Sequence, residues 1–118
     1  TRIMDHAMFP EYTRELGEKK ASLAPQNIEV WRNFSRTIFK DGALDEKTKH
    51  IIAIAVAHVT QCPYCIRAHT PQALRKGATE EEIMEAIWVA AEMRAGAAYA
   101  HGSLAVDEMN KYREKNEK

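Results

Sequence analysis

The stretch that decides the fold is residues 44–69, LDEKTKHIIAIAVAHVTQCPYCIRAH, in which an apolar segment runs into two closely spaced cysteines. Asp45 is a good helix N-cap, because its carboxylate can accept hydrogen bonds from the open N–H groups of a first turn. Between residues 51 and 59 the one strongly polar residue is His58. A helix that is apolar on nearly every side must be buried on nearly every side, and a small domain achieves this most easily against a second subunit. The stretch therefore predicts a buried helix and a homo-oligomer.

The segments on both sides of this stretch have apolar residues at a period near 3.6, without the alternation that is typical of strands. Further helices are expected where a periodic segment follows a start signal: about 9–21, from Pro25 to about Asp41, from Cys62 or Pro63, from the capping box of Thr79 and Glu82, and from about Ala100. Pro71 should kink or end the helix that starts at the cysteines. The sequence thus predicts an all-α bundle of about six helices in a single domain, residues 1–118.

The composition excludes several classes of function. The 118 residues include 17 Lys+Arg and 17 Asp+Glu, so the formal net charge is zero and no basic face for nucleic acid or polybasic membrane anchor is expected. The longest strongly apolar run, residues 51–57, is far too short to span a bilayer, and residues 1–6 lack a signal-peptide core. Two cysteines cannot build the disulfide framework of a secreted scaffold. We expect a cytoplasmic protein that binds neither nucleic acid nor membrane.

Cys62 and Cys65 form a C-x-x-C motif at an expected helix start, and His69 follows four residues after Cys65. Residues three, four and seven apart share a helix face, so the three side chains should form one short column. The helix N-terminus stabilises a thiolate, and a nearby imidazole can take or return its proton. A sulfenic acid formed on one cysteine would be captured by the other, which releases water and leaves a disulfide. The motif favours redox chemistry.

Two other interpretations of the cysteines stay open. Free cysteines are often small buried apolar residues. Zinc could be held by Cys62, Cys65 and His69, with His58 or His101 as the fourth ligand. The chain has no second C-x-x-C or H-x-x-x-H pair, so redox chemistry is preferred and neither a metal nor a cofactor is predicted.

Upstream of the motif, His50, Ile54, His58 and Cys62 are spaced by four. If the apolar helix reaches the turn intact, His50 and His58 would face roughly the same way as the cysteine pair. The alternative for each is a hydrogen-bonded structural histidine. His101 could line the same cavity or lie at a subunit interface.

Together with residues 77–86, the quoted stretch resembles the carboxymuconolactone decarboxylase superfamily and, within it, the alkyl hydroperoxidase D-like proteins. The resemblance covers about residues 44–96. It implies an all-α fold that assembles as trimers or hexamers and reduces a peroxide substrate through the cysteine pair, which an external dithiol reductant regenerates. By the same resemblance Cys65 is attacked by peroxide, Cys62 is the resolving partner and proton donor, and His69 is the relay histidine.

His50 stands where this family commonly has a glutamate as the base of the relay, so His58, one turn before Cys62, could take over as base. The nearest glutamate, Glu46, lies a turn too early for that role. We predict a thiol-dependent peroxidase whose catalytic residues are Cys65, Cys62, His69, His58 and His50. The alternatives are a decarboxylase-like enzyme that acts on a small acid or lactone through His50, His58 and His101, and a non-catalytic oligomer that senses redox state or binds metal.

Overall fold

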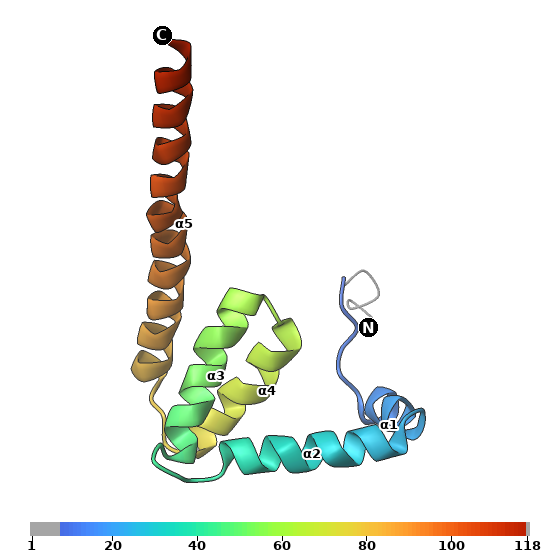
Figure 1. The fold of residues 1–118 in the computed structure, drawn as a ribbon. Helices are drawn as coiled ribbons and strands as arrows, with labels where there is room; N and C mark the ends of the chain where they lie inside the picture. The colour runs from blue at the N-terminus through green and yellow to red at the C-terminus, as the bar shows by residue number, and fades with distance from the viewer. Residues whose placement is uncertain (1–7, 118) are drawn as a thin grey trace. The chain divides into compact units, whose positions relative to one another are not determined.

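The computed structural model describes residues 8–117, which form five α-helices and no strand (Figure 1). The helices are α1 (Arg14–Ser22), α2 (Pro25–Phe39), α3 (Glu46–Thr60), α4 (Pro63–Arg75) and α5 (Glu80–Asn116). The predicted all-α class is confirmed. None of these helices is long and apolar enough to cross a membrane. Residues 1–6, on which the expectation about a signal peptide rests, lie outside the described residues.

The chain divides into two compact units, Thr1–Ala43 and Leu44–Lys118. In the first unit α1 packs against α2. In the second unit α3 packs against both α4 and α5, and it lies between them (Figure 1). The expectation of a single domain over residues 1–118 stays a prediction.

Local capping fixes where most helices begin. Asp45 caps α3 by accepting a hydrogen bond from the Thr48 N–H at 2.8 Å, as predicted. Thr79 and Glu82 form the predicted capping box at the start of α5. The first helix begins at Arg14 rather than near residue 9, because Thr13 accepts from the Leu16 N–H at 3.2 Å and so acts as an N-cap that the sequence interpretation missed.

The described residues hold five helices where about six were expected, because α5 continues through the place where a last helix was expected to start. Gly96 and Gly102 both lie inside this helix, and among the described glycines only Gly77 has a positive φ. Alanines surround Gly96, and their high helix propensity offsets the cost of about 1 kcal/mol for one glycine. With 37 residues, α5 is about 55 Å long, more than twice the length of the 15-residue α3.

Pro71 does not end α4, which continues to Arg75. Proline removes the hydrogen bond to the carbonyl of Arg67, four residues earlier. Both residues are exposed, so water can satisfy that carbonyl. The helix that carries the cysteines therefore extends a further turn past the proline.

The core of the second unit holds α3 and α4 face to face. Ile54 of α3 is fully buried and lies in one cluster with Ala73 of α4, Ala78 and Ile83. Burying an isoleucine side chain contributes roughly 1.5–3 kcal/mol. Because the alanine is small, the two helices can approach closely, and this approach sets the distance between the side chains of the site.

Many large apolar side chains remain exposed. In α5 only Ile83 and Ala90 are buried, while nine large side chains along the helix are exposed: Met84, Trp88, Val89, Met93, Tyr99, Leu104, Val106, Met109 and Tyr112. The apolar helix α3 also leaves Ile52 and Val56 about half exposed. Packing within the second unit therefore covers only part of the apolar surface of α3 and α5.

Candidate functional site

The two cysteines lie at the turn where α3 ends and α4 begins. Gln61 closes α3 in the left-handed conformation, with φ 59° and ψ 53°, and redirects the chain. Cys62 is the N-cap of α4, and Pro63 follows at the first helical position, where a missing N–H costs nothing. Cys62 Sγ accepts a hydrogen bond from the backbone N–H of Cys65 at 3.2 Å. The sequence places the motif at a helix start, and the structure agrees.

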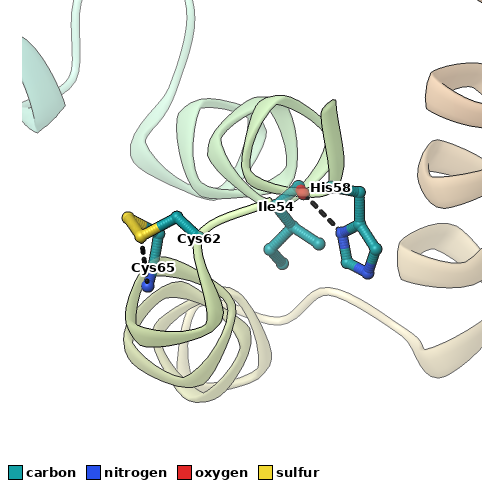
Figure 2. The surroundings of a disulfide bond; sticks show 4 residues. All are labelled: Ile54, His58, Cys62 and Cys65. Carbon is teal, nitrogen blue, oxygen red and sulfur yellow. Dashed lines mark hydrogen bonds between the residues drawn. A yellow bond between two sulfur atoms is a disulfide. The ribbon is translucent and has the colours of Figure 1, made fainter. Parts of the chain in front are cut away.

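Cys62 and Cys65 are joined by a disulfide, and their Cα atoms are 5.3 Å apart (Figure 2). Both residues are half-buried, so the pair is reachable from the surface. Because the positive end of the α4 dipole lies at the cysteines, it would stabilise a thiolate in the reduced state. The site can therefore hold both a dithiol and a disulfide.

Two histidines from different helices meet at the middle of α4. His50 projects from α3 with only 2% of its surface exposed, and His69 lies on α4 one turn after Cys65. The two Nδ1 atoms are 3.0 Å apart, a hydrogen-bond distance, and the ring centroids are 5.2 Å apart. The sequence singled out His69 for its spacing from the cysteines. In the structure it contacts His50, the more deeply buried of the two histidines of α3.

Glu46 is a member of this cluster that the sequence interpretation set aside. One carboxylate oxygen lies 3.2 Å from His50 Nε2, and the other lies 3.3 Å from Lys76 Nζ. The hydrogen bond with His50, helped by Lys76, lowers the pKa of the Glu46 carboxyl against the opposing effect of burial. The signal that could have found Glu46 is its spacing from His50, because residues four apart are neighbours on a helix.

The environment of His69 favours the neutral imidazole. Burial is the larger cause that lowers the pKa of His69 below its ordinary 6.5, and repulsion from His50 acts in the same direction. At neutral pH His69 is therefore able to accept a proton.

His58 is not brought to the cysteines. Its Nδ1 lies 2.8 Å from the Ile54 carbonyl oxygen, and Figure 2 shows the imidazole on the other side of Ile54 from the disulfide. The expectation that His58 would face the cysteine pair is not met by the structure. From His50 to His58, eight helical residues turn the side chain by about 80°. The left-handed Gln61 further separates the register of α3 from that of the cysteines.

His101, the other candidate for a fourth zinc ligand, is not grouped with the cysteines. His101 is exposed on α5, where its Nδ1 lies 2.8 Å from the Ala97 carbonyl oxygen of the same helix. Within residues 8–117 no three His, Cys, Asp or Glu side chains are grouped in a way that could hold a metal ion. A zinc site at the cysteines therefore has no support from this geometry.

The helical fold and most of the sequence match a known family. The model of the carboxymuconolactone decarboxylase family matches residues 25–108. The chain belongs to the carboxymuconolactone decarboxylase family. The match begins at the first residue of α2 and includes α3, the cysteine turn, α4 and most of α5.

Several family members and relatives resemble the chain over most of its length. It is 57% identical to uncharacterized protein 4 of the cox locus of Paracoccus denitrificans over 99 residues, which cover 83% of this chain and 87% of that protein. The crystal structure of an apo family member from Legionella pneumophila is similar with TM-score 0.65 and 31% identity, covering 83% of this chain and 88% of that one. A Thermotoga maritima family member, for which a part in an antioxidative response has been suggested, has TM-score 0.56 and 29% identity and covers 78% of this chain and 95% of its own.

Proposed function

We propose that this carboxymuconolactone decarboxylase family protein is an alkyl hydroperoxidase D-like, thiol-dependent peroxidase. The observation that carries the proposal is the cysteine pair at the start of α4, close enough to form a disulfide, with His69 one turn further along the same helix. The half-buried pair is reachable, and the helix N-terminus stabilises a thiolate. The antioxidative role suggested for the Thermotoga maritima relative supports the same assignment.

The proposed cycle has three steps. The Cys65 thiolate attacks one peroxide oxygen, the O–O bond breaks, and the leaving alkoxide or hydroxide takes a proton to become an alcohol or water. Cys65 is then a sulfenic acid. The Cys62 thiolate attacks the Cys65 sulfur and displaces hydroxide, which leaves as water after protonation, and a disulfide forms. An external dithiol reduces this disulfide and is itself oxidised.

The histidine pair supplies the proton transfers of the cycle. His69 is neutral at pH 7 because burial lowers its pKa, so it can take the thiol proton and later return it to the leaving oxygen. His50, at 3.0 Å from His69, stands where the family commonly has a glutamate and takes the role of supporting base. His58 points elsewhere, so we assign that role to His50.

The direct test is peroxide consumption by the purified protein. With dithiothreitol as reductant, hydrogen peroxide or cumene hydroperoxide should disappear catalytically, over many equivalents per cysteine pair. Without the reductant, consumption should stop after one equivalent, because each pair can close only one disulfide. Consumption at the rate of dithiothreitol alone with both peroxides would refute the proposed function.

The exposed apolar residues of α5 are suited to contact with further copies of this chain. We expect these copies to form a trimer or hexamer. In sedimentation equilibrium the wild type should have three or six times the 13.4 kDa mass of one chain. The double variant Val89→Glu/Met93→Glu places charges on two exposed apolar positions one turn apart and should shift the mass toward the single chain. Glu92 is exposed and lies between these two positions in the sequence. The variant Glu92→Gln is therefore the matched control and should assemble as the wild type does. A wild type that sediments as a single chain would contradict this expectation.

A further inference from the structure

Each ring nitrogen of His50 has a partner of a different kind. Nε2 lies 3.2 Å from the Glu46 carboxylate, and Nδ1 lies 3.0 Å from His69 Nδ1. A neutral imidazole carries one N–H donor and one acceptor nitrogen, while an ionised carboxylate can only accept. The order of donors and acceptors along the three groups is therefore restricted by the charge of Glu46.

The carboxylate of Glu46 determines this order. It is held ionised, since His50 and Lys76 both lower its pKa and Lys76 lies 3.3 Å from its second oxygen. Nε2 of His50 must then donate, which leaves Nδ1 of a neutral His50 as an acceptor. The nitrogen facing that acceptor is His69 Nδ1, so it must donate. His69 in turn holds its proton on Nδ1 and has an unprotonated Nε2.

We infer that Glu46 is a positioning residue, which fixes the tautomer of His50 and, through it, makes His69 Nε2 the nitrogen that accepts the thiol proton. The inference rests on the proposed function only in naming a thiol as the source of that proton. The tautomers themselves follow from the contacts of the three side chains.

The same contacts give the proton a path. When His69 Nε2 accepts a proton, the proton on His69 Nδ1 can pass across the 3.0 Å contact to His50 Nδ1. The positive charge then lies on His50, which is almost fully buried but in contact with the Glu46 carboxylate. A buried charge is costly unless it is paired, and Glu46 supplies the pairing. The thiol S–H bond and the His69 Nδ1–H bond break, N–H bonds form at His69 Nε2 and at His50 Nδ1, and no electron is transferred.

Nitrogen-15 NMR of the histidine rings tests the inference in the wild-type protein, without any variant. In the oxidised protein at a pH where both rings are neutral, His50 should carry its proton on Nε2 and His69 should carry its proton on Nδ1. A proton on Nε2 of His69 would overturn the inference, whether or not the protein consumes peroxide. If the protein has the expected tautomers but consumes no peroxide, the inference is upheld and the proposed function is refuted.

A variant adds the causal test. In Glu46→Ala, His50 loses its carboxylate acceptor, so the proton of His69 should leave Nδ1 for Nε2 in a large part of the population. The rate of peroxide reduction should fall by about 10²-fold, the lower end of what acid–base groups contribute. Glu85→Ala, at an exposed acidic position of α5, is the control and should keep the wild-type tautomers and rate. Unchanged His69 tautomers in a folded Glu46→Ala protein would overturn the inference.

Discussion

Peroxide consumption is expected to fall by at least about 10³-fold when Cys65 is replaced by serine, as commonly follows loss of a catalytic nucleophile. A serine hydroxyl has nearly the shape of the thiol but ionises far less readily, so neither the helix dipole nor His69 can make it a competent nucleophile at neutral pH. The measurement is the rate of loss of hydrogen peroxide in the presence of dithiothreitol. The melting temperature should stay close to that of the reduced wild type.

Cys62→Ser is the matched control for this variant, because it alters the same helix start and removes the same disulfide. It should still consume about one equivalent of peroxide rapidly and should accumulate a Cys65 sulfenic acid that a dimedone probe labels. Full catalytic activity of Cys65→Ser, or dimedone labelling of Cys62 in Cys65→Ser without labelling of Cys65 in Cys62→Ser, would contradict the assigned order of the two cysteines.

The second large effect is expected at His69. His69→Ala should lower the rate of peroxide reduction by about 10²–10⁴-fold near pH 7, the range that general acid–base groups contribute. The loss should shrink as the pH rises toward the thiol pKa, because solvent then removes the proton without help. His101→Ala is the control: this histidine is exposed on α5, bonded to its own helix, and its loss should leave the rate unchanged.

The pH profile follows from the direction of the His69 shift. Burial and His50 lower the pKa of His69, so its neutral form persists as the pH falls through 6.5 and is lost only below that value. In the oxidised protein, an NMR titration of the His69 ring should have its midpoint below 6.5. A midpoint above 6.5, or equal loss of activity in His69→Ala and His101→Ala, would remove His69 from the mechanism.

Most helix starts could be predicted, because they depend on a few adjacent residues. Asp45, Pro63 and Thr79 each mark the start of a helix by satisfying or removing an open N–H group. The continuity of α5 could not be predicted from the sequence, since one glycine among alanines is compatible with both a helix and a break. Thr13 was the missed local signal, and it moves the start of α1 to Arg14.

The residues of the site that lie on one helix could be predicted from their spacing, whereas the contacts between helices could not. The spacing of Cys62, Cys65 and His69 predicts one face of a helix, and the structure has Cys62 as the N-cap of α4 with Cys65 and His69 within that helix. Contact between His50 and His69 depends on how α3 packs against α4 around Ile54, which no short pattern specifies. Glu46 was set aside because its place in the chain was judged relative to the cysteines, whereas its structural partner is His50, one turn away.

Whether the cysteine pair itself reacts with peroxide is decided by titrating the fully reduced protein with peroxide and analysing the intact chain and its peptides by mass spectrometry. We expect each equivalent of peroxide to remove two hydrogen atoms from one chain and to join Cys62 to Cys65 in an internal disulfide, and we expect dithiothreitol to reverse the change. Cysteines that remain reduced after several equivalents of hydrogen peroxide and of cumene hydroperoxide would contradict it.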